Sequence, residues 1–209
     1  MDTRALLHRY LDQCPLIAII RGVTPDEAEG IGEALYEAGI RIIEVPLNSP
    51  DPIESIRRLA AKFGERALLG GGTVFTPANV EDIAAAGGRL VVSPHTNPAV
   101  IRAAVAAGMV SCPGYFTPTE AFAALDAGAT ALKLFPAEAA APEVLKAQLA
   151  VIPKDVPIII VGGVKPDNMR RWSEAGAAGF GLGGGLYQPG QSAHDTLAKA
   201  KAYVAEVQS

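Results

Sequence analysis

The 209-residue sequence is poor in the features that several functional classes require. Its two cysteines, Cys14 and Cys112, lack the paired spacing of zinc or redox motifs, so reduced thiols in a cytoplasmic protein are expected. Charged residues make up only 19% of the chain, and the net charge of −4 comes without a basic block or stripe. Binding to nucleic acid or to an anionic membrane surface is therefore not expected.

Other signatures are also missing. No apolar run approaches the length of a transmembrane helix, and the first ten residues lack the apolar region of a signal peptide. No cluster of His, Asp and Glu has the spacing of metal ligands, and the sequence has neither a nucleophile-elbow serine nor a dinucleotide fingerprint. The sequence therefore predicts no metal site and no bound cofactor.

What the sequence does contain is a repeated unit, in which a short apolar run precedes a polar turn and an alanine-rich segment with helical spacing. A proline stands near the start of seven such segments, where its missing N–H costs little, and five segments end in Ala-Gly, a common helix stop. The prolines are Pro25, Pro52, Pro77, Pro98, Pro118, Pro142 and Pro166, and the glycines are Gly39, Gly87, Gly108, Gly128 and Gly176.

The apolar runs predict eight buried strands, at residues 16–21, 40–47, 67–74, 90–94, 110–113, 131–136, 157–163 and 179–183. Strands that alternate with helices indicate an α/β fold, and eight units predict a (β/α)8 TIM barrel, with an extra N-terminal helix over residues 4–13 that caps one end. A doubly wound open sheet is the alternative, but it needs fewer strands. No linker is visible, so residues 1–209 are expected to form a single (β/α)8 domain.

Lys133 is anomalous because it lies inside the apolar run at residues 131–136. Lysine is rarely buried unless it is paired or functional, and burial lowers its pKa and favours the neutral amine, which is a nucleophile towards ketones. The alternative is a strand-end lysine whose stem covers apolar surface while its head reaches water.

Glu44 and Arg21 occupy comparable positions at the ends of predicted strands, where barrel active sites form. A carboxylate within an apolar run suggests a general acid/base beside the lysine, although a simple Lys133–Glu44 ion pair would also explain it. Arg21 could hold a substrate carboxylate, or it could pair with a neighbouring acid.

Glycine clusters end the seventh and eighth predicted strands, at Gly162-Gly163 and Gly183-Gly184-Gly185. In such barrels the loops after the last two strands often bind phosphate through backbone N–H groups, so these clusters indicate a phosphate site. A third cluster, residues 70–72 before Thr73, either makes room inside the barrel or allows close strand packing.

Taken together, the chain resembles the KDPG/KHG aldolase family, class I aldolases that cleave 2-keto-3-deoxy-6-phospho sugar acids. The resemblance extends from Leu16 to Gly183. Its marks are Glu44 in its apolar strand, Gly72-Thr73, the run at 132–136 and the run at 161–164. Residues 44–50 are similar to the galactonate branch, because the gluconate branch tends to have Thr at the positions of Pro46 and Val161 and Arg near Asn48. One departure is Gly184, where the family commonly has a serine whose hydroxyl helps to hold phosphate.

The resemblance implies a mechanism without a cofactor. Lys133 would form a Schiff base with the C2 ketone, and Glu44 would take the C4 hydroxyl proton, which gives pyruvate and glyceraldehyde 3-phosphate. The implied substrate-binding residues are Arg21, Thr73, Pro94, Phe135 and Val161, and the implied phosphate-binding residues are Gly162, Gly163, Gly183 and Gly184. The resemblance also implies a homotrimer. Two alternatives stay open: a phosphosugar isomerase or epimerase that forms no covalent adduct, and a non-catalytic phosphosugar-binding protein.

Overall fold

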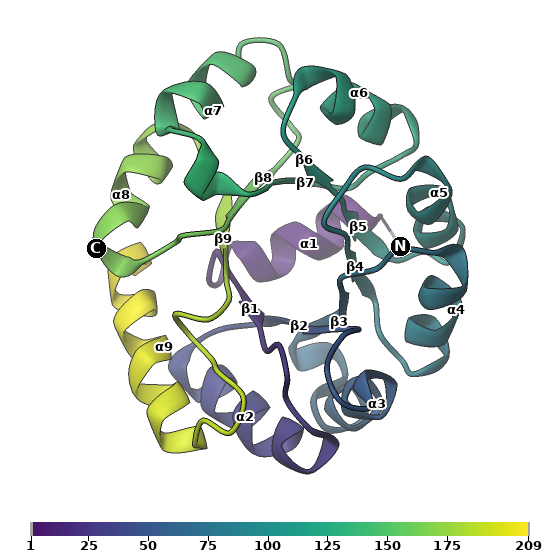
Figure 1. Ribbon diagram of the computed structural model, residues 1–209, viewed down its shortest axis with the longest axis vertical. Helices are drawn as coiled ribbons and strands as arrows, with labels where there is room; N and C mark the ends of the chain where they lie inside the picture. Colours follow the sequence, from purple (N-terminus) through teal and green to yellow (C-terminus); the bar gives the residue numbers. More distant parts are fainter. Residues whose placement is uncertain (1, 209) are drawn as a thin grey trace.

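Parallel strands form the centre of the protein in the computed structural model, which describes residues 2–208 (Figure 1). The strands are β1 (Leu16–Ile19), β2 (Ile42–Pro46), β3 (Leu68–Gly72), β4 (Leu90–Val92), β5 (Val110–Cys112), β6 (Gly114–Tyr115), β7 (Leu132–Leu134), β8 (Ile158–Val161) and β9 (Gly179–Leu182). They pair in the order β5-β4-β3-β2-β1-β9-β8-β7-β6, and every pair is parallel. The strands curve into a nearly closed barrel, so the predicted fold is confirmed (Figure 1).

The barrel differs from the prediction at its fifth strand. The sequence predicts one strand over residues 110–113, but the structure has two short strands, β5 and β6, on either side of Pro113. Proline has no N–H to donate, so the strand is interrupted there. β5 pairs with β4 and β6 with β7, while the N–H of Lys133 donates to the carbonyl of Pro113 at 2.9 Å. The described barrel therefore has nine strands in place of eight, and it closes through this broken strand.

Helices surround the barrel in the described part of the chain (Figure 1). They are α2 (Pro25–Ala38), α3 (Pro52–Phe63), α4 (Pro77–Ala85), α5 (Pro98–Ala106), α6 (Pro118–Asp126), α7 (Pro142–Gln148), α8 (Pro166–Glu174) and α9 (Ala193–Gln208), with short 3-10 turns η1 (Gly64–Arg66) and η2 (Ala137–Ala139). Helices α2 to α8 begin at the seven predicted prolines, and the five glycines of the Ala-Gly stops have φ between 68° and 111°. Both sequence signals are thus confirmed.

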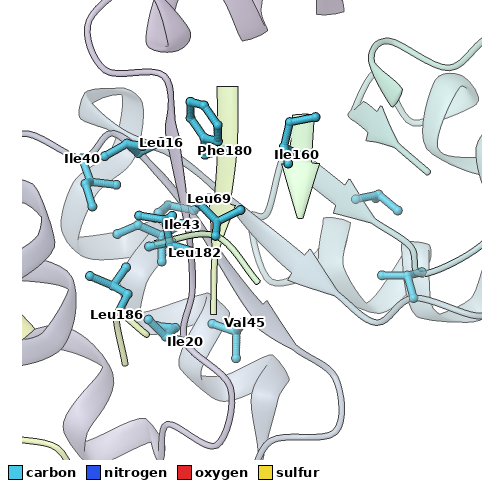
Figure 2. Close-up of a cluster of buried hydrophobic side chains, with 14 of the residues drawn as sticks. Leu16, Ile20, Ile40, Ile43, Val45, Leu69, Ile160, Phe180, Leu182 and Leu186 are labelled. Carbon is cyan, nitrogen blue, oxygen red and sulfur yellow. The ribbon is translucent and has the colours of Figure 1, made fainter. Parts of the chain in front are cut away.

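Alternation along the strands separates two hydrophobic layers. Side chains that point outward pack beneath the helices, and the inward-pointing set fills the lower part of the barrel. Figure 2 labels ten of the outer layer: Leu16, Ile20, Ile40, Ile43, Val45, Leu69, Ile160, Phe180, Leu182 and Leu186. The inner set at the strand starts includes Ile17, Ile42, Leu68, Leu90 and Val110.

The N-terminal helix α1 (Thr3–Leu11) closes one end of the barrel, as predicted, and it lies behind the ring of strands in Figure 1. Leu7 and Tyr10 are each 1% exposed and pack with the inner set of strand residues. Full burial of such side chains stabilises the fold by about 1.5–3 kcal/mol each. Of the helices described within residues 2–208, none is long and apolar enough to cross a membrane. The filled lower half leaves the C-terminal ends of the strands as the open end.

Candidate active site

A cavity of about 590 Å³ opens at the C-terminal ends of the strands. All the site residues predicted from the sequence line it, although they come from seven different strands or the loops that follow them. They are Arg21, Glu44, Thr73, Pro94, Lys133, Phe135, Val161, Gly162, Gly163, Gly183 and Gly184. The structure thus brings the whole predicted set together, whereas the chemical role of each residue stays a prediction.

Glycines on inward-facing strand positions create this space. A Cβ added to Gly72 would lie about 1 Å inside the 3.0 Å approach that real Cβ atoms respect, against the carboxylate of Glu44. A Cβ on Gly181 would lie 2.7 Å from Val161 Cγ2, and one on Gly71, which points outward, would lie 2.5 Å from Ile83 Cδ1. The triplet at 70–72 therefore serves both purposes that the sequence left open, since it makes room for Glu44 and allows close packing of a helix.

Glu44 is almost completely buried on β2, with 2% of its surface exposed. Burial raises the pKa of its carboxyl from 4.5 to about 7, although the charges of Lys133 and Arg21 act in the opposite direction. Oxygen Oε2 has no hydrogen-bond partner among the described residues. A buried polar atom of this kind is costly, so Glu44 combines an unsatisfied oxygen with a pKa suited to proton transfer near neutral pH.

Lys133 lies on β7 and is 7% exposed. Burial lowers the pKa of its ammonium, and this effect exceeds the opposing influence of Glu44 and Cys112. Its Nζ lies 4.5 Å from the ring centroid of Phe135. Within residues 2–208, no Lys133–Glu44 contact meets the 4.0 Å limit for an ion pair, so a simple buried ion pair does not account for the two residues. The alternative of a lysine whose head reaches bulk water is equally at odds with its burial.

Arg21 follows β1 at the rim of the cavity, and its hydrogen-bond partners are neutral. One guanidinium nitrogen donates to Asn48 Oδ1, and the other donates to Thr73 Oγ1 at 3.4 Å. No carboxylate in the described chain forms an ion pair with it, which sets aside the predicted alternative of a neighbouring acid. Its charge is therefore available to an anionic ligand.

Thr73 adopts an unusual backbone conformation directly after β3, with φ of 58°. A left-handed conformation is strained for a β-branched residue and costs about 1–3 kcal/mol. Strain of this kind persists where the surrounding structure imposes it, and here it places the hydroxyl of Thr73 beside Arg21. Thr73 thus joins Arg21 at the same side of the cavity.

The glycine clusters follow β8 and β9, whereas Asn48 and Thr73, the partners of Arg21, follow β2 and β3. Gly162 and Gly163 have φ of 108° and 65°, and a Cβ on Gly162 would lie 2.6 Å from the carboxylate of Glu138. A Cβ added to Gly183 or Gly184 would meet no atom within 4 Å, so the backbone there is open to the cavity. Bare backbone N–H groups at such turns suit an anion.

Several cavity residues are absent from the sequence prediction: Phe75, Glu138, Lys165, Tyr187 and Gln188. Each follows the C-terminal end of a strand by a few residues, so the barrel rule alone could have drawn attention to them. Glu138, Lys165 and Gln188 carry no signal of their own in the sequence, because charged and polar residues are common in loops.

Comparison with known proteins places this arrangement in a family. The family model described as "Aldolase: KDPG and KHG aldolase" matches residues 7–200. The chain belongs to the KDPG and KHG aldolase family. The predicted resemblance is therefore confirmed, and with it the class of enzyme, a carbon–carbon lyase.

Individual relatives refine this placement. The chain is 49% identical over 196 residues to 2-dehydro-3-deoxy-6-phosphogalactonate aldolase of Escherichia coli (strain K12), which covers 94% of this chain and 96% of the relative. A solved structure described as "Native KDPGal structure" superimposes with a TM-score of 0.92 at 47% identity, covering 94% of this chain and 95% of the other. KHG/KDPG aldolase of the same strain is 29% identical over 156 residues, 75% of this chain and 73% of the relative.

Proposed function

We propose that this protein is a class I aldolase that cleaves 2-dehydro-3-deoxy-6-phosphogalactonate to pyruvate and glyceraldehyde 3-phosphate. The observation that carries the proposal is the buried Lys133, whose pKa is lowered by burial, in one cavity with Glu44, whose pKa is about 7. A neutral amine and a carboxyl that titrates near neutral pH are the nucleophile and the acid/base that Schiff-base chemistry requires.

The reaction begins at the substrate ketone. Neutral Lys133 Nζ adds to C2, and the resulting carbinolamine loses water to give a protonated imine. Glu44 accepts the C4 hydroxyl proton, directly or through a water, and the C3–C4 bond breaks as its electrons move into the imine. The aldehyde leaves, the carboxyl of Glu44 gives the proton it accepted to C3 of the enamine, and water hydrolyses the resulting imine to release pyruvate and free Lys133.

The carboxylate and the phosphate of the substrate bind at different parts of the cavity. Arg21 and Thr73 bind the carboxylate beside the ketone, and Pro94 and Phe135 form the walls there. Gly162, Gly163, Gly183 and Gly184 receive the phosphate through their backbone N–H groups. No metal or cofactor takes part in this scheme.

Of the two C4 epimers of the substrate, the galactonate epimer is the one that we propose the protein cleaves. Val161 is 7% exposed and points into the cavity, where it offers no hydrogen bond to a substrate hydroxyl. The higher identity to the galactonate aldolase of E. coli than to its KHG/KDPG aldolase supports the same choice. The alternative is the gluconate epimer, cleaved by the same groups, and kinetics with both epimers distinguishes them.

The experiment that tests the proposal traps the imine. The protein is treated with pyruvate and borohydride, and its intact mass and peptides are measured by mass spectrometry. A reduced pyruvyl adduct on Lys133 is expected, absent without pyruvate and absent from Lys133→Ala. Lys154→Ala is the matched control, because Lys154 is exposed and does not line the cavity. A folded protein without the adduct would rule out Schiff-base chemistry and favour a non-covalent isomerase, epimerase or binding protein.

The proposed working form is a cytoplasmic homotrimer in which residues 1–209 act as a single domain. Both cysteines are free and buried, as in proteins of reducing compartments. Four large apolar side chains on the outer helices and the loop after α7 are exposed and could be covered between subunits: Val105, Phe122, Val144 and Val151. Light scattering coupled to size-exclusion chromatography tests the assembly, and a mass near 21.6 kDa would refute it.

A further inference from the structure

Lys165 is a cavity residue with no place in the mechanism above. It is the second residue after the Gly162-Gly163 pair, and it lines the cavity together with Gly184. It is exposed, and it immediately precedes α8. A cation at this position is therefore within the region assigned to the phosphate.

Lysine is a poor choice for the local structure at this helix start. It occupies the N-cap position of α8, where a side-chain oxygen normally accepts a backbone N–H, and an ammonium cannot accept. Its charge also lies beside the positive end of the helix dipole. Helices α4 and α6 begin after Thr76 and Thr117, whose hydroxyls accept from Asn79 N and Glu120 N. At α8, as at α7, the N-cap side chain makes no such bond, so capping does not account for the lysine at this position.

The turn that carries Lys165 is held by a neighbouring side chain. Asn168 accepts from the N–H of Lys165 at 3.0 Å and donates through Nδ2 to the carbonyl of Gly163 at 2.8 Å. This pair of bonds links the backbone of Lys165 to the glycine pair. The lysine is thus anchored next to the backbone groups that would meet the anion.

Near the glycine clusters, a bound phosphate would need a cation to offset the negative charge of Glu138. Position 184 has no side chain to donate a hydrogen bond, and the carboxylate of Glu138 lies against Gly162 and repels an anion. The guanidinium of Arg21 is bonded to Asn48 and Thr73, which follow β2 and β3, whereas the glycine clusters follow β8 and β9. Within the described chain, Glu138 and Lys165 form no ion pair.

We propose that Lys165 binds the phosphate of the substrate beside the open backbone of Gly183 and Gly184, and that Glu138 weakens this binding. The proposal rests on the proposed function, since it concerns the same substrate in the same cavity. In this proposal the ammonium of Lys165 binds the phosphate, and the carboxylate of Glu138, which lies against Gly162, repels it.

Steady-state kinetics with two substrates tests the assignment. Lys165→Met is expected to raise KM for the phosphorylated substrate about 10- to 100-fold, as expected for loss of a hydrogen bond to a charged group, and to leave KM for 2-dehydro-3-deoxygalactonate unchanged. Glu138→Gln is expected to lower KM for the phosphorylated substrate. Lys154→Met, an exposed lysine outside the cavity, is the control and should change neither value. An unchanged KM in Lys165→Met, or an equal rise for both substrates, would overturn the proposal.

A second variant separates binding from folding. Lys165→Thr restores the type of N-cap residue found at α4 and α6, so it is expected to raise Tm while it still raises KM for the phosphorylated substrate. Loss of stability together with loss of binding would instead indicate a structural role for the lysine.

The imine trap keeps the two proposals distinguishable. Lys165→Met should form the pyruvate adduct on Lys133 as the unaltered protein does, because pyruvate carries no phosphate. If neither protein forms an adduct, the aldolase proposal fails, and calorimetry with inorganic phosphate still decides on Lys165. Phosphate binding that is weaker in Lys165→Met supports the assignment, and equal binding refutes it.

Discussion

Gly72→Ala tests whether the Glu44 carboxylate must occupy its observed position. The added methyl group would enter the space that both carboxylate oxygens and Cδ now fill, about 1 Å inside the limit of 3.0 Å for real Cβ contacts. Gly72 lies in the regular strand β3 rather than in the left-handed region, so alanine adds no backbone strain. The carboxylate must therefore move by about 1 Å, or the strands must separate.

The expected effects follow from this displacement. A misplacement of about 1 Å in a reacting group costs on the order of 10²-fold in rate, equivalent to about 3 kcal/mol in the activation free energy. Overpacking of a buried site lowers the free energy of unfolding by about 1–3 kcal/mol. The rate of retro-aldol cleavage should thus fall at least 10²-fold, while Lys133 still forms the pyruvate adduct.

The assay compares turnover and denaturant unfolding in a double-mutant cycle with Glu44→Ala. Once the Glu44 side chain is removed, Gly72→Ala should lose most of its destabilising effect. Gly30→Ala is the control, because that glycine lies in α2 with no atom within 4 Å of a Cβ position and should gain about 0.5–1 kcal/mol. Activity of Gly72→Ala within twofold of the unaltered protein, or a stability loss that persists without Glu44, would refute the reasoning.

Three further predictions concern the catalytic role of Glu44 and a buried hydrogen bond of the fold. Glu44→Gln should slow cleavage by about 10²–10⁴-fold while some adduct still forms on Lys133, as quenched-flow and borohydride trapping would show. Because the pKa of Glu44 is about 7, the carboxylate is lost as pH falls through 7, and a pH–rate profile should show cleavage declining on that acidic side; a flat profile between pH 6 and 8 would contradict the assignment. Gln148→Ala removes the acceptor of the buried Tyr115 hydroxyl (3.0 Å) and should lower the free energy of unfolding by about 1–3 kcal/mol in urea titrations; no loss of stability would contradict the importance of this bond.

The barrel could be predicted from the sequence because its signals are local and repeated. The prolines at seven helix starts and the glycines at five helix stops report backbone conformations that few other residues favour, and the structure has them at the expected positions. The break at Pro113 follows from the same chemistry, since proline cannot donate within a ladder, but it is visible only once the neighbours of that strand are known. The order in which the strands pair cannot be read from the sequence.

In the site, too, some residues could be predicted from the sequence and others could be found only from the structure. Lys133 and Glu44 stand out in the sequence because charge is out of place in an apolar run. Glu138 and Lys165 lie in loops where charge is ordinary, so their position in the cavity depends on how the loops fold over the barrel end. The contact between Gly72 and Glu44 depends on the register of β2 against β3 and could not be read from either segment alone.

Helix α1, which closes the lower end of the barrel, also bears on where substrate enters and products leave. Leu7 and Tyr10 of α1 are buried against the inner strand residues, and the cavity lies at the opposite end of the barrel. A substrate of the proposed reaction would therefore enter through the end that carries the strand C-termini. In the proposed mechanism the aldehyde leaves first, because the three-carbon fragment is still bound covalently to Lys133, and the fragment then leaves through the same end of the barrel.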